Sequence, residues 1–239
     1  MTLQKNDFIE IEFTGRIKDG EVFDSNIPEE LKKLNSNQKA KPFIFCLGQD
    51  MFLKGVEEFL IGKDIGKYEI ELRPENAFGM RSQSLIQMIP LKVFIEHQIK
   101  PVPGAVLTFD NRVGKVLTVS GGRIMVDFNN PLAGKEVVYN INILRKVEDI
   151  NEKINSLNEF LFRRDFKFTI DDKKLIIEVE KELKPFVELF KDKFKEMLDL
   201  DMELKEIEAV KDKEEKRDEE KEIEPVKDKE EKKEVEREE

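Results

Sequence analysis

The chain has 239 residues, a net charge of −10 and a single cysteine. This length allows one large domain or two to three small ones. The acidic balance argues against nucleic acid as the main partner, and one cysteine excludes an internal disulfide framework. The first residues, MTLQKNDFIEIEF, contain no basic segment followed by an apolar core, and no apolar run approaches the roughly 20 residues that span a membrane. We therefore expect a soluble, cytoplasmic protein.

The first third of the chain predicts half-buried β-strands and one short helix. In residues 7–17, DFIEIEFTGRI, apolar and polar residues alternate, so one face of this strand would be buried. Residues 42–47 and 66–74 predict two further strands. Residues 51–61, MFLKGVEEFLI, predict a short helix with one apolar side.

From about Leu85 the pattern changes. The segment LIQMIPLKVF is apolar and is interrupted by Pro90, and three short strands follow near residues 105–109, 112–119 and 123–128. Asp-Asn and Gly-Gly dipeptides mark the turns between them.

The stretch DFNNPLAGKEV, residues 127–137, is too long for an ordinary hairpin, which uses two to five residues. Pro131 forbids a ladder hydrogen bond, and Leu132 is apolar where a turn is usually polar. The stretch either connects two strands of one sheet or carries the chain from one domain into another. The strand VVYNINILRKV follows it and contains Tyr139.

A small α+β unit of about 60 residues is predicted from residue 150 onward. Its expected elements are a helix INEKINSLNEFLF, a hairpin from FKFTI and KLIIEV, a helix ELKPFVELFKDKFKEMLDL and a last strand DMELKEIEAV. The tail, residues 211–239, is almost entirely charged and contains a repeat at a spacing of 16 residues. It cannot bury a core, so a disordered, solvated spacer is expected.

The usual catalytic side-chain sets are missing. His97 is the single histidine, which argues against a zinc site or a Ser-His-Asp triad. Cys46 lies inside a predicted strand, where a buried small hydrophobe is expected. No Walker loop or dinucleotide fingerprint occurs. An enzyme built on this chain needs neither metal, cofactor nor nucleophile.

Four motifs follow one another in a different pattern: FTG (13–15), DGEVFDS (19–25), PFIFCLGQDMFLKGVEEFLIG (42–62) and RPENAFG (73–79). In order and spacing they resemble the signature of the FKBP-type peptidyl-prolyl isomerases. The resemblance covers about residues 5–84 and 135–148. It implies an antiparallel β-sheet wrapped on a short helix, within an α+β fold, and an apolar active-site pocket between sheet and helix.

The resemblance also implies the residues of that pocket, and Asp24 would be its one polar wall, orienting the substrate carbonyl and tying down a neighbouring side chain. The implied pocket residues are Phe13, Phe23, Asp24, Phe43, Phe52, Leu53, Val56, Phe78 and Tyr139. Val56 stands where many members carry Trp, and Phe13 and Phe78 stand where Tyr is common. The pocket should therefore be roomier and more apolar than in those members.

Such a pocket suits the reaction. Rotation about a peptide bond costs about 18–20 kcal/mol, and water stabilises the planar, polar amide more than the twisted one. An apolar aromatic pocket removes that preference, and lowering the barrier by about 4 kcal/mol gives roughly a thousandfold. Plain core packing is the competing interpretation for any single Phe; the ordered motifs favour the pocket.

About 50 residues separate the AFG motif from the last strand. They resemble the insert-in-flap domain of SlyD-type and archaeal long-type FKBPs, which implies binding of unfolded polypeptides. Its apolar residues exceed what so small a domain easily hides. The expected contact residues are Ile86, Met88, Ile89, Leu91, Val93, Phe94, Ile95 and Phe128. Filling the small core is the alternative role for these side chains.

The predicted organisation is an isomerase domain formed by residues 1–84 and 137–149, an inserted chaperone domain at 85–136, a C-terminal α+β domain at 150–210 and the tail. The C-terminal unit resembles the extra domain of archaeal long-type FKBPs, which implies either a homodimer or further substrate contact. SlyD's metal-binding tail is absent. Two functions remain open: an isomerase acting on proline-containing unfolded chains, or mainly a holdase chaperone with weak isomerase activity.

Overall fold

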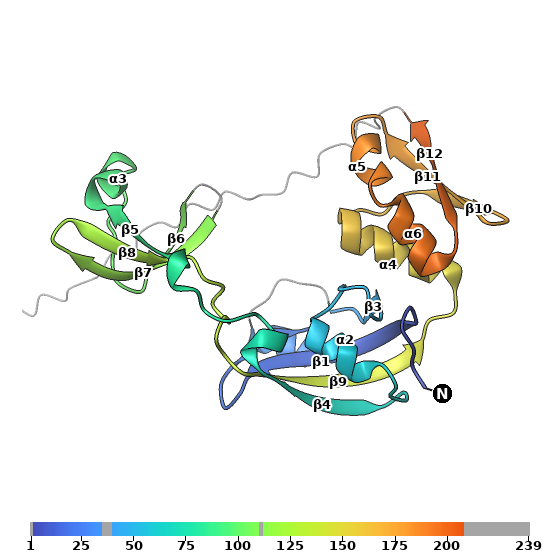
Figure 1. The fold of residues 1–239 in the computed structure, drawn as a ribbon, viewed down its shortest axis with the longest axis horizontal. Helices are drawn as coiled ribbons and strands as arrows, with labels where there is room; N and C mark the ends of the chain where they lie inside the picture. The colour runs from blue at the N-terminus through green and yellow to red at the C-terminus, as the bar shows by residue number, and fades with distance from the viewer. Residues whose placement is uncertain (1, 35–39, 110–111, 208–239) are drawn as a thin grey trace, which may run out of the picture.

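The computed structural model describes residues 2–34, 40–109 and 112–207, which form three separate β-sheets. Figure 1 shows the sheet that contains β1 and β9 as the base of the molecule, and the two smaller sheets rise from its opposite ends on the same side. The α+β architecture expected from the sequence is confirmed. We call the three parts the main sheet, the insert (86–128) and the C-terminal unit (150–207).

The main sheet is antiparallel throughout and has the order β2-β1-β9-β4, with β3 also paired to β1. Its strands are β1 (Phe8–Ile17), β2 (Val22–Ser25), β3 (Phe43–Cys46), β4 (Lys67–Leu72) and β9 (Val137–Lys146). Two helices accompany them: α1 (Pro28–Lys33) and α2 (Lys54–Leu60). The sequence patterns predicted each of these except β2 and α1, which are short. β9, the last strand in the chain, lies in the middle of the sheet, so the insert is an excursion between two neighbouring strands.

The inner face of the main sheet is apolar because residue types alternate along each strand. Ile9, Ile11 and Phe13 of β1 are buried in the apolar cluster that also contains Val56 and Leu60 of α2, while Glu10 and Glu12 are less buried. Gly55 lets α2 come close to the chain after β4, because a Cβ there would lie 2.6 Å from the carbonyl oxygen of Asn76.

The insert is a four-stranded antiparallel sheet with the order β5-β8-β7-β6 and one short helix. Its elements are β5 (Ile86–Pro90), α3 (Leu91–Glu96), β6 (Val106–Phe109), β7 (Arg112–Ser120) and β8 (Arg123–Asp127). Pro90 ends the strand and α3 starts directly after it, since proline cannot continue a ladder. The expected Asp-Asn turn lies at residues 110–111, outside the described residues.

The two segments that connect the insert to the main sheet lie side by side. Asn129 holds them together: its Oδ1 accepts from the Ser82 backbone N–H at 2.8 Å, and its Nδ2 donates to the Ser82 carbonyl at 3.0 Å. The Gly134 N–H donates to the Gly79 carbonyl at 2.8 Å, and Arg81 pairs with Asp127. The stretch after β8 is therefore one half of a two-stranded connection between the insert and the main sheet.

The C-terminal unit packs helices against a three-stranded sheet of order β10-β11-β12. Its elements are α4 (Ile150–Phe162), β10 (Phe168–Asp171), β11 (Lys174–Glu180), α5 (Lys184–Glu188), α6 (Lys191–Leu198) and β12 (Asp201–Ile207). Asp149 caps α4 by accepting from the N–H groups of Asn151 and Glu152.

The single helix expected for ELKPFVELFKDKFKEMLDL is wrong, because the chain breaks it into α5 and α6 at Phe190. Phe190, at the break, and Phe194 of α6 both contact Phe162, at ring-centroid distances of 5.2 and 6.3 Å. The break thus lies among side chains in tertiary contact, the setting in which local helix propensity is a weak guide.

The charged tail predicted for residues 211–239 lies outside the described residues, as does the end of the strand expected at 208–210. Among the helices of the described residues, none has both the length and the apolar character needed to cross a membrane.

Candidate active site

An aromatic cluster occupies the inner face of the main sheet. It joins six of the predicted pocket residues: Phe13, Phe23, Phe43, Phe52, Phe78 and Tyr139. Phe13 lies at its centre, with ring-centroid distances of 5.0 Å to Phe52 and 6.1 Å to Tyr139. Most pairs meet edge to face, the arrangement that aromatic quadrupoles favour.

Backbone pairing places Tyr139 in this cluster. In the register of the sheet, Gly15 of β1 is opposite Tyr139 of β9. A Cβ at Gly15 would lie 2.9 Å from the Tyr139 ring and 3.0 Å from the Phe23 ring. The glycine of the FTG motif therefore makes room for both rings.

The loop before α2 is held by a buried carboxylate. Glu57 is only 2% exposed, and its Oε2 accepts from the N–H groups of Gly48 and Gln49 at 2.7 and 3.0 Å. Its Oε1 accepts from the Phe52 N–H at 2.6 Å. Backbone N–H groups thus compensate the burial of this carboxylate, and Glu57 fixes the backbone that carries Phe52.

Asn26 and Ser25 fix the opposite edge of the site. Asn26 accepts from the Phe13 N–H at 2.7 Å and donates to the carbonyls of Ile11 and Lys41. Ser25 Oγ donates to the Phe13 carbonyl at 2.9 Å. Asn26 and Ser25 therefore bind both backbone groups of Phe13, its N–H and its carbonyl.

Asp24 is half-buried beside these residues. Burial raises the pKa of its carboxyl above the ordinary value, and a hydrogen bond from the Ser25 backbone partly offsets this. Burial, and secondarily the negative charge of Asp24, raise the pKa of the Tyr139 hydroxyl. Tyr139 is therefore neutral throughout the physiological range.

The cluster opens into a cleft of about 760 Å³, within the usual size of a ligand pocket. Of the predicted residues, Phe13, Asp24, Phe43 and Phe52 line this cleft. The others contribute from behind: Tyr139 and Val56 are buried, and Phe23, Leu53 and Phe78 are half-buried. On the main-sheet side, Asp24 is the only carboxylate among the described residues that lines the cleft.

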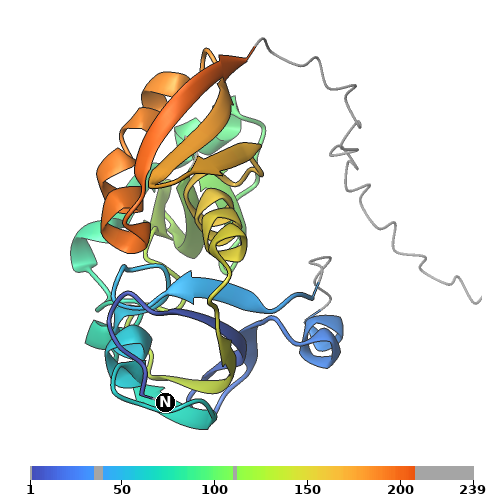
Figure 2. The same ribbon diagram turned by 90° about the vertical axis from the view of Figure 1, so that its right-hand side faces the viewer.

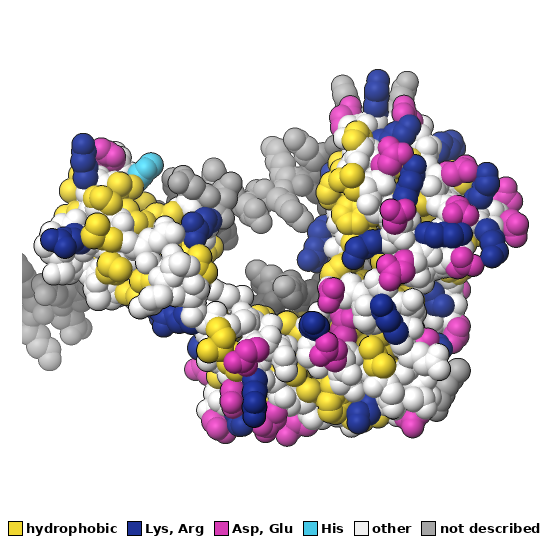
Figure 3. Space-filling view, viewed as in Figure 1, with side chains coloured by type: hydrophobic (Ala, Val, Ile, Leu, Met, Phe, Trp, Pro, Cys, Tyr) yellow, Lys and Arg dark blue, Asp and Glu magenta, His cyan; other side chains and the backbone are white. Residues whose placement is uncertain are grey.

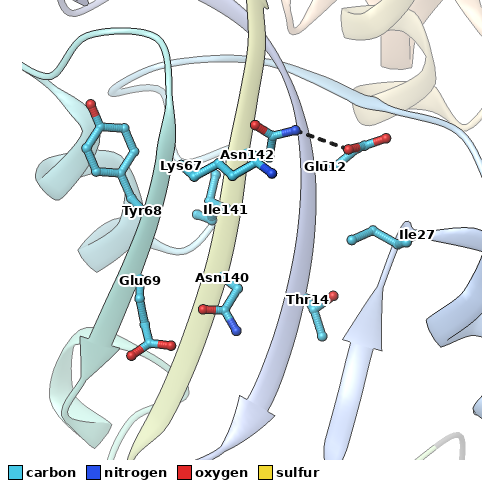
Figure 4. Close-up of a pocket in the computed structure, with 9 residues that line it drawn as sticks. All are labelled: Glu12, Thr14, Ile27, Lys67, Tyr68, Glu69, Asn140, Ile141 and Asn142. Atoms are coloured by element: carbon cyan, nitrogen blue, oxygen red, sulfur yellow. Dashed lines mark hydrogen bonds between the residues drawn. The ribbon is translucent and has the colours of Figure 1, made fainter.

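A second hollow of about 400 Å³ lies on the outer face of the main sheet. Figure 4 shows Glu12, Thr14, Asn140 and Asn142 along β1 and β9, where Asn142 donates to Glu12 at 3.2 Å. Alternation along the strands puts these polar side chains on the face opposite Phe13 and Tyr139. The aromatic cluster and this hollow are therefore separated by the sheet.

Comparison with known proteins supports the resemblance. The chain is 30% identical over 146 residues to a short-type peptidyl-prolyl cis-trans isomerase of Methanocaldococcus jannaschii, covering 59% of this chain and 92% of that protein. It is 31% identical over 149 residues to an FKBP-type 16 kDa peptidyl-prolyl cis-trans isomerase of Escherichia coli, covering 60% and 93%. The chain belongs to the FKBP-type peptidyl-prolyl cis-trans isomerase family.

Two further matches concern proteins or domains with an insert in the FKBP fold. A SlyD isomerase of Haemophilus influenzae is 28% identical over 159 residues, covering 64% of this chain and 77% of that protein. Residues 87–132 match the family model described as FKBP26, IF domain. The insert of this FKBP is thus related to an insert-in-flap domain, as its sequence suggested.

The predicted contact residues of the insert separate into two groups. Phe94 is buried in the core with Val116, Ile124 and Val126. Met88 and Ile95 are 54% and 64% exposed. The remaining predicted residues, Ile86, Ile89, Leu91, Val93 and Phe128, are half-buried.

Figure 3 shows apolar side chains across much of the visible face of the insert. Sequence reasoning missed four exposed valines there: Val102, Val106, Val113 and Val119. Val113 and Val119 of β7 each stand between polar or glycine residues, a signal that was available, but no such pattern marks Val102 or Val106.

Sequence reasoning also missed residues of the FKBP site itself. Phe45 stacks on Phe43 at 5.3 Å and contacts Phe52 at 5.6 Å. Glu57 resembles its exposed neighbour Glu58 in sequence, and only the apolar side of α2, on which Glu57 lies, distinguishes the two. Residues of α4 line the cleft as well, and no local pattern indicated this.

Proposed function

We propose that the protein catalyses cis–trans isomerisation of peptidyl-prolyl bonds in polypeptides, and that the insert delivers unfolded chains to the site. The observation that supports the first part most strongly is the cleft lined by Phe13, Phe43 and Phe52 together with a half-buried Asp24. Among the described residues, the main-sheet side of this cleft is an apolar aromatic surface with one carboxylate, Asp24.

The mechanism is differential binding of the twisted amide. The rings replace water around the prolyl ring, so the planar ground state loses the hydration that favours it. Phe13 and Phe52 are held by backbone hydrogen bonds to Asn26 and Glu57, so the pocket does not reorganise during rotation. Asp24 contributes a fixed negative field at the pocket edge.

A protease-free assay on an X-Pro-Phe tetrapeptide tests this proposal. The wild type should accelerate isomerisation, and Asp24→Ala and Tyr139→Ala should each lower kcat/KM. Since Tyr139 is buried, its variant needs a thermal unfolding curve to separate lost folding from lost activity. A folded wild type without activity would favour the competing function, a holdase chaperone.

The second part of the proposal rests on the exposed apolar side chains of the insert. Met88 and Ile95 together with the exposed valines form apolar surface that a small domain does not bury. Met is adaptable and suits varied partners. Unfolded, proline-containing polypeptides are therefore the proposed clients.

Self-association through the C-terminal unit is also proposed. Leu189 is 76% exposed and Phe186 is 48% exposed, beside the ring contacts that link Phe186, Phe190 and Phe162. A second copy of the chain would cover this patch. Sedimentation should give a dimer for the full chain and a monomer for Leu189→Asp; a wild-type monomer would rule this out.

A further inference from the structure

The cleft has two walls that come from different parts of the chain. One wall is the aromatic site of the main sheet. The other belongs to the C-terminal unit: its lining residues are Glu152, Asn155, Ser156, Glu159, Phe160, Arg163 and Asp165. Figures 1 and 2 both show α4 lying next to β3, which carries Phe43.

The wall formed by α4 is fixed in place. Buried residues of α4 such as Ile154 and Leu157 belong to the same apolar cluster as Phe8 and Phe45 of the main sheet. Polar contacts add to this packing: Lys41 Nζ lies 2.7 Å from Glu159, and Arg145 lies 2.8 Å from Glu152.

The connection continues beyond α4. Gln49, in the loop that Glu57 organises, donates to Glu196 of α6 at 2.9 Å. The C-terminal unit is therefore docked on the loop that carries Phe52, and its position relative to the prolyl pocket is defined by both packing and hydrogen bonds.

The residues of α4 that face the cleft form one stripe. Positions 152, 155, 156, 159 and 163 are spaced by one, three or four residues, which places them on a single side of a helix. Glu152 and Glu159 are paired with cations, so the stripe is polar with its charge partly compensated. Asn155 is exposed and Phe160 is half-buried on this wall.

This chemistry suits an extended polypeptide. Each residue of such a chain brings one N–H donor and one carbonyl acceptor that lose water inside a cleft. The Asn155 amide can both donate and accept, and Phe160 offers an apolar contact for a side chain. A peptide extended on both sides of the proline presents more of these groups to the wall than a tetrapeptide does.

We propose that α4 forms the second wall of the substrate cleft and that Asn155 and Phe160 bind the residues flanking the proline. This inference rests on the proposed isomerase function and adds a specificity determinant to it. The C-terminal unit then selects longer polypeptides over short ones, independently of the insert.

The test uses the full chain and two peptides with the same X-Pro-Phe centre, one a tetrapeptide and one extended by about four residues at each end. Asn155→Arg places a long side chain at the α4 wall of the cleft. Because Asn155 is exposed, the fold should tolerate this exchange. Asn151→Arg makes the same exchange at an exposed site of α4 outside the cleft lining.

With Asn155→Arg, KM for the extended peptide should rise about fivefold or more, while kcat and the tetrapeptide rate stay within about twofold of the wild type. Such a change indicates that binding common to the ground state and the transition state has been lost. Phe160→Leu should act in the same direction with a smaller effect. An unchanged KM, or an equal rise with Asn151→Arg, overturns the proposal.

A binding measurement separates this inference from the isomerase proposal. Fluorescence polarisation of the labelled extended peptide should show weaker binding by Asn155→Arg than by Asn151→Arg. If the wild type binds in this way but does not isomerise either peptide, the isomerase function fails and the second wall stands. If binding is insensitive to Asn155, the second wall fails whatever the activity.

Discussion

The main sheet and the insert use apolar residues in opposite ways. In the main sheet, Phe13, Phe52 and Tyr139 are in mutual contact, and backbone hydrogen bonds hold the segments that carry them. In the insert only a small core is fully buried, while Met88, Ile95 and several valines are exposed. The difference fits the proposed functions: stabilising one twisted amide requires a rigid surface, whereas binding many different sequences requires an open and adaptable one.

The largest effect is expected when the insert, the proposed client-binding part, is removed from the isomerase site. Replacing residues 86–128 with a short Gly-Ser loop leaves Asn129 paired with Ser82, so the main sheet should still close. Acceleration of proline-limited refolding of a protein should fall about 100-fold, because the insert no longer concentrates the client near the site. The tetrapeptide rate should stay within about twofold of the wild type. Equal loss in both assays would contradict the division of labour.

The rigidity of the aromatic site is tested at Glu57. Glu57→Gln keeps the shape of the side chain but removes the charge that accepts several backbone N–H bonds. We expect the free energy of unfolding, measured in urea, to fall by about 3 kcal/mol. Glu58→Gln is the matched control on the same helix, since Glu58 is exposed and only pairs with Lys54 at 3.7 Å. Equal effects of the two exchanges would show that the buried carboxylate does not hold the loop.

The apolar cleft itself is tested at Phe52. Phe52→Ala should lower kcat/KM for the tetrapeptide about 30-fold, equivalent to about 2 kcal/mol of lost transition-state stabilisation. Phe59→Ala provides the comparison, because Phe59 is also half-buried but contacts Tyr68 at 6.0 Å and does not line the cleft. Neither change should alter the ability of the insert to suppress aggregation. A similar loss of activity in both variants would mean that general packing, not the cleft, supports catalysis.

The open surface of the insert is tested with Met88→Ser and Ile95→Ser combined. Both side chains are more than half exposed, so the fold should lose little stability. Affinity for an unfolded client should fall about fivefold as apolar area is lost, while the tetrapeptide rate is unchanged. Lys92→Ser, at an exposed position of α3, should have no such effect. An unchanged affinity in the double variant would place client binding elsewhere.

Local patterns were sufficient to predict most of the main sheet and the insert. Alternation in β1 and β9 predicted both strands and the inward side of Phe13 and Tyr139, because a strand has a fixed two-residue period. The ordered motifs added the rest of the aromatic cluster. These features depend on neighbours along the chain or on a family pattern that the chain retains.

Contacts between distant segments were not predictable in the same way. Glu57 and Glu58 are adjacent and chemically equal, and only the docking of α2 makes one buried and the other exposed. Phe190, at the break between α5 and α6, contacts Phe162, which is 28 residues earlier in the chain. The cleft wall of α4 depends on how the C-terminal unit docks, which no local periodicity encodes.

The smallest expected effect concerns Asp24, a half-buried carboxylate of the site whose ionisation should lower the stability of the fold. Burial raises the pKa of this carboxyl in the folded protein above its unfolded value. Such a group contributes stability that is fully present below the unfolded pKa and is lost as the pH rises through the folded pKa. At neutral pH the ionised Asp24 therefore lowers the free energy of unfolding. Asp24→Asn should raise the melting temperature slightly at pH 7 and leave it nearly unchanged near pH 3, where the wild-type carboxyl is protonated.

The same variant should isomerise the tetrapeptide more slowly, because the cleft loses the negative charge on its main-sheet side. Opposite signs for stability and activity distinguish a functional carboxylate from a structural one. Asp19→Asn is the control, since Asp19 is an exposed turn residue whose positive φ of 57° Asn also tolerates. A lower melting temperature for Asp24→Asn at pH 7 would mean that the carboxylate stabilises the fold, and the aromatic site would then be rigid partly because of Asp24.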